Sequence, residues 1–278
     1  MSHSMGMGNM GSMSMGMGHM QDLRKTAHKM MGMGMGNDMG IPDKNPAKYT
    51  RTLGHTIVTS LVTQTTTTLT VLTGQHNEVN TDFMAVVAFL YYGTAPGTIT
   101  CVDSLGNTYS PVATVTFNTD YTVKVFYAAG IHSIAKNAII TITHPASTRR
   151  ILMADEFKNM EKTNTTDQVA TGKNTIAATF ATSGMLGMTS QDKELLYGVI
   201  AVNGSSIDTF KKPTNWSLLH DRGTNAGDGH DIRLIAQYRN VNDTGTFEVS
   251  GTFGTASLWA GITQSFKAEG GASAVTPD

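Results

Sequence analysis

The sequence has little charge, few aromatic side chains and a single cysteine. Charged residues make up 15% of the 278 residues, and the formal net charge is −1. No strong electrostatic field is therefore available to hold phosphates, which excludes nucleic-acid binding driven by bulk charge. Cys101 has no cysteine partner, so no intrachain disulfide forms. We expect it to be a small buried side chain, because its sequence neighbours supply neither a histidine nor an electropositive setting for a reactive thiol.

Long apolar runs and an export signal are also missing. No uninterrupted apolar stretch approaches the roughly 20 residues that a membrane helix needs, so we expect no membrane span. The N-terminal stretch lacks the basic start, compact apolar segment and small-residue cleavage site of a secretory signal. The sequence thus predicts a protein that is made and kept in the cytoplasm until it is assembled or released.

Methionine and glycine, in contrast, are concentrated in one region. The first 40 residues hold 13 of the 18 methionines and nine of the 29 glycines. Frequent glycine makes regular structure costly, because each glycine loses more backbone freedom on ordering than any other residue. We expect residues 1–45 to form an extended arm that is disordered alone and ordered on assembly, with a hinge at IPDKNP. The polar stretch Gln21–Lys29 has room for about two helical turns at most.

The rest of the chain has the pattern of β-strands. From about Tyr49, threonine alternates with Val, Ile or Leu in HTIVTSLVT and TTTLTVLT, the period-two pattern of half-buried strands. The continuously apolar FMAVVAFLYY predicts a central strand buried on both faces. Turn residues recur at about 8–12-residue spacing, in GQHNE, APG, DSLGN, FNTD and SIAKN. This spacing is typical of an antiparallel sandwich or barrel.

The second half repeats the strand pattern without a linker-like break between Pro145 and Gly251. We therefore predict an all-β protein with one antiparallel β-sandwich, jelly-roll or immunoglobulin-like, over residues 46–268. Two smaller stacked sandwiches are the alternative. Residues 269–278 are predicted to form a flexible tail.

Several short motifs follow one another in an order that carries a resemblance. They are VDSLGNTY, VKVFYAAGI, ILMADEFKNM, TTDQVATG and KELLYGVIAVNG. This order resembles a widespread β-sandwich module of bacterial and phage-encoded surface and virion proteins, over roughly residues 80–268. The resemblance implies a sandwich fold and a place in an assembly, and it implies no reaction. One position departs from the module, because EFKN stands here where the module has a sequence like EYSG.

Candidate catalytic and metal-binding residues are sparse. Asp155 and Glu156 are adjacent carboxylates in an apolar strand, but neighbours in a strand point to opposite faces and do not share a substrate atom. In the loop LLHDRGTNAGDGHDIR, Asp221, Asn225 and Asp228 are possible oxygen donors for calcium. Their spacing matches neither the helix-flanked calcium loop nor a zinc site, so we predict a solvated loop. With no nucleophile or phosphate-binding motif, we expect no enzyme activity and no cofactor.

The methionine-rich arm has two interpretations. Thioethers bind Cu(I) and histidines accept either copper ion, so a copper-binding tail is one hypothesis; its ligands are Met5, Met7, Met15, Met17, His19, Met33 and Met35. Methionine is also flexible and polarisable, and fills irregular apolar grooves on a partner. In extended M-G-M-G every methionine lies on one side, which suits strand addition to a neighbour's sheet edge. We favour this assembly arm, formed by Met5, Met7, Met10, Met13, Met15, Met17, Met20, Met30, Met31, Met33, Met35 and Met39.

These expectations combine into three hypotheses. The first is a structural virion or surface-assembly protein, a capsid, decoration or tail component, that packs against copies of itself or other subunits. Its location would then be the virion, after synthesis in the host cytoplasm, or an extracellular surface assembly. The second is a carbohydrate-binding fibre or adhesin module, with a groove lined by exposed aromatics from Tyr91, Tyr92, Tyr109, Trp216 and Tyr238. The third is copper binding through the arm.

Overall fold

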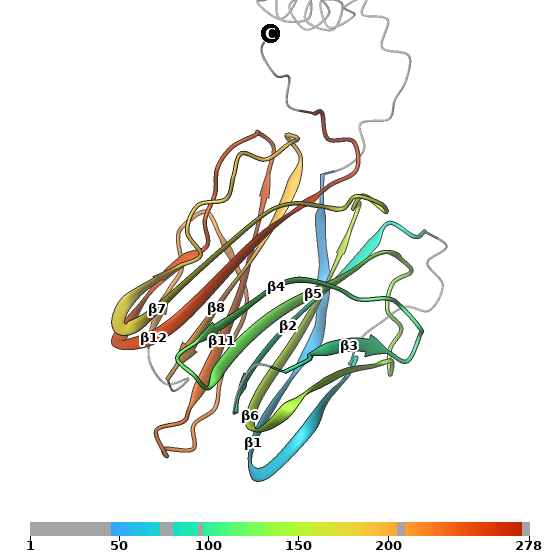
Figure 1. The fold of residues 1–278 in the computed structure, drawn as a ribbon. Helices are drawn as coiled ribbons and strands as arrows, with labels where there is room; N and C mark the ends of the chain where they lie inside the picture. Colours follow the sequence, from blue (N-terminus) through green and yellow to red (C-terminus); the bar gives the residue numbers. More distant parts are fainter. Residues whose placement is uncertain (1–45, 73–79, 94–96, 205–208, 274–278) are drawn as a thin grey trace, which may run out of the picture. The chain divides into compact units, whose positions relative to one another are not determined.

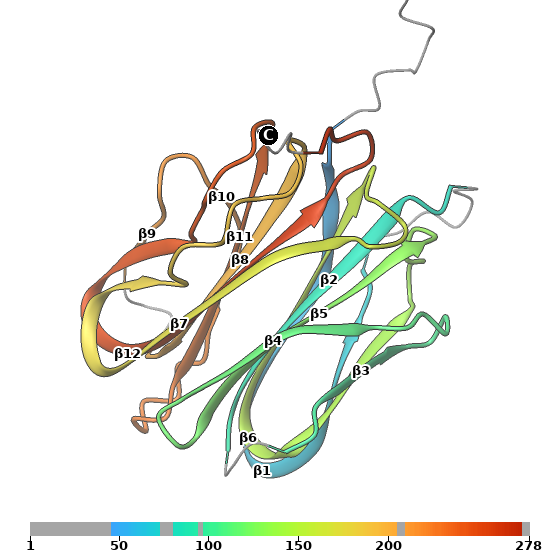
Figure 2. The ribbon, with the colours of Figure 1, turned by 45° about the horizontal axis from the view of Figure 1, so that its top comes forward.

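Two antiparallel sheets packed against each other form the protein, which confirms the predicted all-β sandwich (Figures 1 and 2). The computed structural model describes residues 46–72, 80–93, 97–204 and 209–273, apart from the side chains of residues 60 and 61. Their regular structure is all β-strand. Within these ranges no helix is long and apolar enough to cross a membrane.

The first half of the chain makes the first sheet, in the order β1-β6-β2-β5-β4, with β3 added beside β6. Its strands are β1 (Lys48–Thr70), β2 (Phe83–Tyr92), β3 (Thr100–Asp103), β4 (Ser110–Phe117), β5 (Tyr121–Ile131) and β6 (Ile139–Lys158). The central strand β2 is the apolar FMAVVAFLYY, and it is buried over nearly its whole length as predicted.

The second half makes the second sheet, in the order β10-β11-β8-β12-β7, with β9 added beside β12. Its strands are β7 (Thr166–Thr182), β8 (Glu194–Asn203), β9 (Phe210–Lys211), β10 (Ser217–Gly223), β11 (Ile232–Val241) and β12 (Ser250–Lys267). No strand of the described chain crosses from one half into the other sheet.

The two sheets have the same topology, strand for strand. Each half begins and ends with a long strand, and these two strands pair with each other along their length. Phe157 faces Met84 in the first half, and Phe266 faces Leu195 in the second. The sheets also meet reciprocally, because β4 contacts β7 and β12 while β10 contacts β1 and β6. The sandwich is thus a duplicated half-sandwich, with its two copies related by an approximate twofold arrangement.

Each long strand pair bends and folds back over the outer face of its own sheet. In the first half, the bend separates the pair Thr59–Arg149 from the pair Thr66–Thr143, and β3 extends the returning part. HTIVTSLVT and TTTLTVLT, expected as separate strands, are therefore two arms of the single bent strand β1. The β7–β12 pair bends in the same way, at the left of Figure 1.

This folding back creates three apolar layers. The main core lies between the sheets and contains alternate residues of β2 and β8, such as Met84 and Leu195. A second core fills the space between the first sheet and its returning strands, and it contains Leu53, Leu69 and Phe89. A third lies on the outer face of the second sheet. Both faces of each sheet are therefore covered, which explains why β2 and β8 are apolar without alternation.

Close approach of the bent β7–β12 pair depends on two glycines that face each other. Gly172 on β7 pairs with Gly261 on β12. A β-carbon at Gly172 would lie 2.4 Å from the carbonyl oxygen of Thr182, and one at Gly261 would lie 2.8 Å from the amide nitrogen of Ser183. The end of β7 thus returns directly onto this pair, at a distance that only glycine permits.

The turns agree with the sequence in part. In DSLGN the Asp103 carboxylate accepts hydrogen bonds from the amides of Leu105 and Asn107, and Gly106 has a φ of +81°. The turn is confirmed, and β3, which leads into it, pairs with β6 and not with β4. The FNTD and SIAKN turns are confirmed. GQHNE and most of APG lie outside the described residues.

Substituting Gly172 tests the requirement for close approach. We expect Gly172→Ala to lower the free energy of unfolding by about 1–3 kcal/mol, because the added methyl overlaps the Thr182 carbonyl. Urea denaturation followed by circular dichroism measures the change. Gly204→Ala is the control, because its added carbon meets nothing closer than 3.3 Å. Equal stability of the two variants would show that the bent pair tolerates a side chain.

Candidate functional site

A buried polar cluster joins the two sheets where β1 lies beside β10. The Asp155 carboxylate of β6 accepts hydrogen bonds from Thr52 Oγ1 at 2.9 Å and from the Tyr197 hydroxyl at 3.3 Å. His220 Nε2 of β10 lies 2.9 Å from Asp155 Oδ1. Burial, followed by the charge of Asp155, raises the pKa of Tyr197 well above its usual value, so this hydroxyl stays a donor. All three donors are directed at one carboxylate, and the cluster is a link between sheets.

Glu156, next in the chain, points to the opposite face, as the sequence predicted. Its carboxylate accepts a hydrogen bond of 2.7 Å from the Ile134 amide and lies 3.2 Å from Arg51 Nη2. Ser133 donates to it as well. The two adjacent carboxylates therefore belong to different polar groups and do not form an acid–base pair.

The loop proposed as a calcium ligand set uses its carboxylates in other ways. Asp221 is bound through both oxygens by Arg233, at 2.6 Å each. Asp228 forms an ion pair with Arg149. Across the described ranges, no three His, Cys, Asp or Glu side chains gather as a metal site. Asp221 and Asp228 each pair with an arginine.

The cysteine and the aromatic residues are mostly buried. Cys101 lies in the second core, and burial raises the pKa of its thiol. Trp216 and Trp259 are core residues. Of the aromatics expected to be exposed along a carbohydrate groove, Tyr91, Tyr109 and Trp216 are buried and Tyr92 and Tyr238 are half-buried. That expectation of exposure is wrong for the three buried rings, because both faces of each sheet are covered.

The arm lies outside the described residues. This applies to every methionine assigned to the assembly arm and to His19 and the other proposed copper ligands. Assembly and copper binding through the arm both stay predictions. The proposed C-terminal tail is partly described, and it is held to the sandwich by a hydrogen bond from the Asp192 amide to the Ala272 carbonyl.

Strand β8 begins with a buried carboxyl that the apolar pattern of KELLYGVIAV did not single out. Glu194 is 1% exposed, and its carboxyl lies beside the side chains of Asp167 and Ser265. Burial and, second, the neighbouring Asp167 raise the pKa of Glu194 to about 8. At the equivalent position the first sheet has Phe83, which contacts the ammonium of Lys158. Glu194 thus occupies an apolar position and keeps its proton at neutral pH.

This buried carboxyl predicts a stability that falls as pH rises. The unfolded chain loses the proton near pH 4.5 and the folded protein near pH 8, so the unfolded state binds fewer protons between these values. The free energy of unfolding falls by at most about 5 kcal/mol over this pH range, since each pKa unit is worth about 1.4 kcal/mol. We expect Glu194→Gln to match the parent at pH 5 and to be more stable at pH 9. Urea denaturation at both pH values measures this. A parent with the same pH dependence as the variant would contradict it.

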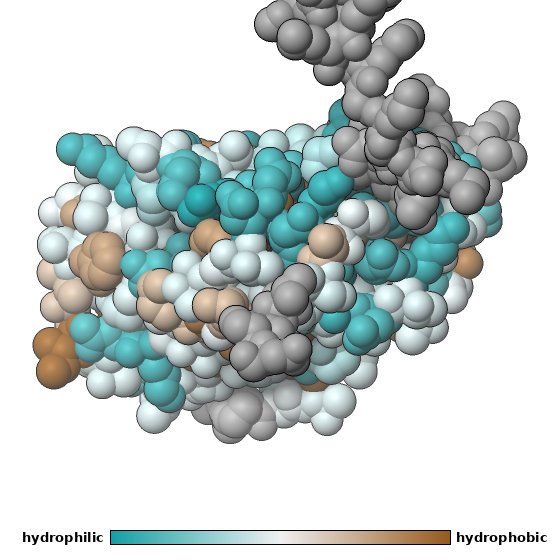
Figure 3. All heavy atoms as spheres, turned by 90° about the horizontal axis from the view of Figure 1, so that it is seen from above, coloured by the Kyte–Doolittle hydropathy of each residue, from teal (hydrophilic) through white to brown (hydrophobic). Residues whose placement is uncertain are grey.

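The distal half of β7 is an exposed sheet edge without charge. Residues 174–182 contain no charged side chain and no proline, and β7 ends the strand order of its sheet. Ile176 is 77% exposed and Phe180 47%. Met185 and Met188, just beyond the strand, are also exposed. Figure 3 shows hydrophobic side chains gathered at one end of the surface, on the side where β7 and β12 bend in Figure 1. We call this segment the β7 edge. It runs from residue 176 to residue 188 and carries the exposed side chains of Ile176, Phe180, Met185 and Met188.

Natural sheet edges usually carry a device against association, such as lysine, proline or a covering segment. Along the strand, the charged residue nearest to the β7 edge is Lys173, whose ammonium donates a hydrogen bond to the Thr116 carbonyl of β4. The sequence predicted a strand here, since NTIAATFAT has the pattern of one. Its position at an edge depends on the pairing of distant strands, which the pattern does not contain.

Comparison with family models, curated proteins and solved structures finds no match to this chain. The resemblance to a virion and surface-protein module therefore stays a prediction.

Proposed function

We propose that the protein is a structural subunit of a virion or surface assembly, a capsid, decoration or tail component. Its sandwich packs against other subunits and its Met/Gly-rich arm anchors it to them. The observation that carries this proposal is the β7 edge, a segment at the end of its sheet that contains no charged residue or proline and exposes the side chains of Ile176 and Phe180. The clusters around Asp155 and Glu156 support the same conclusion, because hydrogen bonds from neighbouring side chains and backbone occupy both carboxylates.

The β7 edge has the properties of an interface between subunits. Burying an exposed Ile or Phe side chain gains about 1.5–3 kcal/mol. A strand added along the edge would also pair with backbone groups that the last strand of a sheet leaves available. Together these terms favour association of the edge with an apolar, extended segment.

The arm has the chemistry that this edge requires. A Met-Gly repeat in extended form presents thioether side chains on one face. Beside the β7 edge is a shallow hollow of about 260 Å³, bordered by Met185, Trp216 and Phe247 and by the polar side chains of Asn215, Arg239 and Glu248. Unbranched methionine side chains adapt to irregular surfaces and gain from contact with aromatic rings. Hence the arm of one subunit and the edge of another form a complementary pair.

Charge on the β7 edge should weaken assembly. We expect the double variant Ile176→Lys, Phe180→Lys to remain folded and to associate at least about tenfold more weakly, because two apolar burials are lost and like charges face each other. Light scattering coupled to size exclusion measures the mass as a function of concentration. The control is Val102→Lys, Leu105→Lys, which adds the same charge at exposed apolar positions elsewhere. Equal assembly of both variants would exclude this edge as an interface.

Removing the arm should separate folding from assembly. Deletion of residues 1–40 is expected to leave a sandwich with the parental circular dichroism spectrum that no longer enters the assembly. Co-expression with the full-length chain, followed by electron microscopy and composition analysis of the assembled fraction, tests this. Normal incorporation of the truncated chain would refute the anchoring role.

A further inference from the structure

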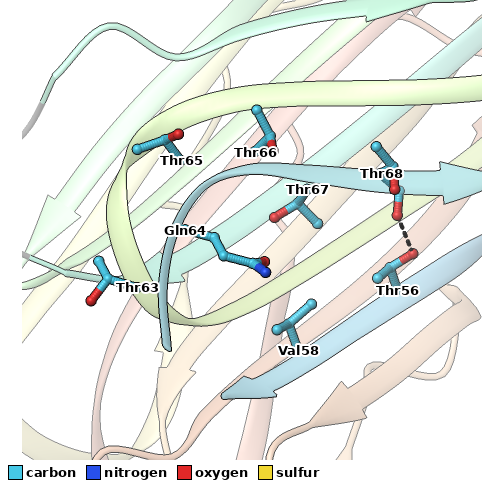
Figure 4. Close-up of a pocket in the computed structure, with 8 residues that line it drawn as sticks. All are labelled: Thr56, Val58, Thr63, Gln64, Thr65, Thr66, Thr67 and Thr68. Atoms are coloured by element: carbon cyan, nitrogen blue, oxygen red, sulfur yellow. Dashed lines mark hydrogen bonds between the residues drawn. The ribbon is translucent and has the colours of Figure 1, made fainter. Parts of the chain in front are cut away.

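The bend of β1 encloses a polar hollow that the assembly role does not use. Its volume is about 490 Å³, within the range of roughly 300–1,000 Å³ that small-molecule sites occupy. Figure 4 shows the side chain of Gln64 extending into the space between the two arms of the bent strand. Six threonines, one glutamine and one valine line it: Thr56, Val58, Thr63, Gln64, Thr65, Thr66, Thr67 and Thr68. The lining therefore offers hydroxyl and amide groups and no negative charge.

A buried cation lies behind the lining of this hollow, in hydrogen-bond contact with the lining residue Gln64. Arg150 is fully buried, and its partner across the sheet is Val58, one of the lining residues. Its guanidinium donates to two neutral oxygens, the Ser147 carbonyl and Gln64 Oε1, the latter at 2.7 Å. Arg150 Nε has no hydrogen-bond partner, and Arg150 forms no ion pair with any described residue.

An unpaired charge of this kind is costly, because arginine stays protonated and burial removes its hydration. Burial alone lowers the pKa of Arg150, with no carboxylate opposing the effect. The neighbouring His144 has no negative charge, so it does not offset the charge of Arg150. Burial and the charge of Arg150 lower the pKa of this imidazole, and its Nε2 makes a 3.0 Å hydrogen bond with Thr67 Oγ1.

The fold does not require a cation at this position. The equivalent residue of the second half is Trp259, which pairs with Val202 as Arg150 pairs with Tyr91. Trp259 fills its place with an apolar ring and no charge, in a half with the same topology. The arginine is thus a specific feature of the half that carries the hollow, and the residues that the structure describes supply no anion to pair with it.

We propose that the hollow binds the oxyanion of a small hydroxyl-bearing molecule, a sugar phosphate or sugar acid, with Arg150 as its counter-ion. The oxyanion takes the place that Gln64 Oε1 occupies beside Arg150. The Gln64 amide and the threonine hydroxyls donate hydrogen bonds to its other oxygens and to the hydroxyl groups of the ligand. Charge-assisted hydrogen bonds to a guanidinium are stronger than the neutral ones they replace.

Calorimetric titration of the full-length protein tests this site. At constant ionic strength we expect inorganic phosphate and glucuronate to bind, and glucose, which lacks the charge, to bind at least about tenfold more weakly. A preference for phosphate or for glucuronate then identifies which oxyanion the site takes. Absence of binding by both anions overturns the proposal.

Two variants assign any binding to the hollow. Gln64→Glu places a carboxylate beside Arg150, so we expect it to raise the melting temperature without ligand and to weaken anion binding by at least about tenfold. Thr70→Glu adds the same charge on the same strand outside the hollow and should retain the parental affinity.

The double variant Thr63→Val, Thr66→Val removes two exposed lining hydroxyls at nearly constant volume, and it should weaken glucuronate binding even if Gln64→Glu does not fold. Undiminished binding in every folded variant overturns the site. Because ligand binding does not depend on self-association, a protein that binds neither anion would leave the assembly proposal unaffected.

Discussion

The structure depends on one constraint, which is that each sheet must cover its own outer face. A sandwich of two sheets buries only their inner faces, yet β2 and β8 are apolar on both. Each half solves this with its longest strand pair, which bends and returns over the sheet from which it starts. The facing pair Gly172 and Gly261 brings the returning chain of the second half into direct contact. Without this folding back, the second and third apolar cores would be exposed to water.

Because the halves share one topology, the places where they differ show where the sequence has become specialised. Asp155 holds a cross-sheet cluster where the second half has Gln264 at the equivalent position. Phe83 corresponds to the buried Glu194. Arg150 corresponds to the apolar Trp259. In each case one half has an ordinary β-sandwich residue and the other has a group whose burial costs free energy. Asp155 offsets this cost through hydrogen bonds that link the two sheets.

The sequence pattern predicts the strands well and their partners poorly. FMAVVAFLYY and DSLGN identify a buried strand and a tight turn from local chemistry, since burial and side-chain hydrogen bonds act over a few residues. The duplication is invisible at this level, because FMAVVAFLYYG and ELLYGVIAVNG share an apolar character but few identical residues. The sequence pattern does not predict the bend of β1 either, because a threonine-rich strand shows the same alternation whether it is straight or bent. A charge within an apolar run, as at Arg150 or Glu194, is the one local signal of the missed sites.

The same bend produces two surfaces with opposite chemistry. β1 and β7 are equivalent strands, and each ends its sheet. The returning arm of β1 is threonine and glutamine, and it lies over a buried arginine. The corresponding part of β7, NTIAATFAT, also contains threonine, but it exposes isoleucine and phenylalanine and has no charge. In the assembly that we propose, two unlike edges imply head-to-tail contact, because an interface that is not self-complementary joins different surfaces of successive copies. On that proposal the bend of β7 would serve assembly, while the bend of β1 would serve the proposed anion site. The two roles would then come from two bends of one topology that differ in their side chains.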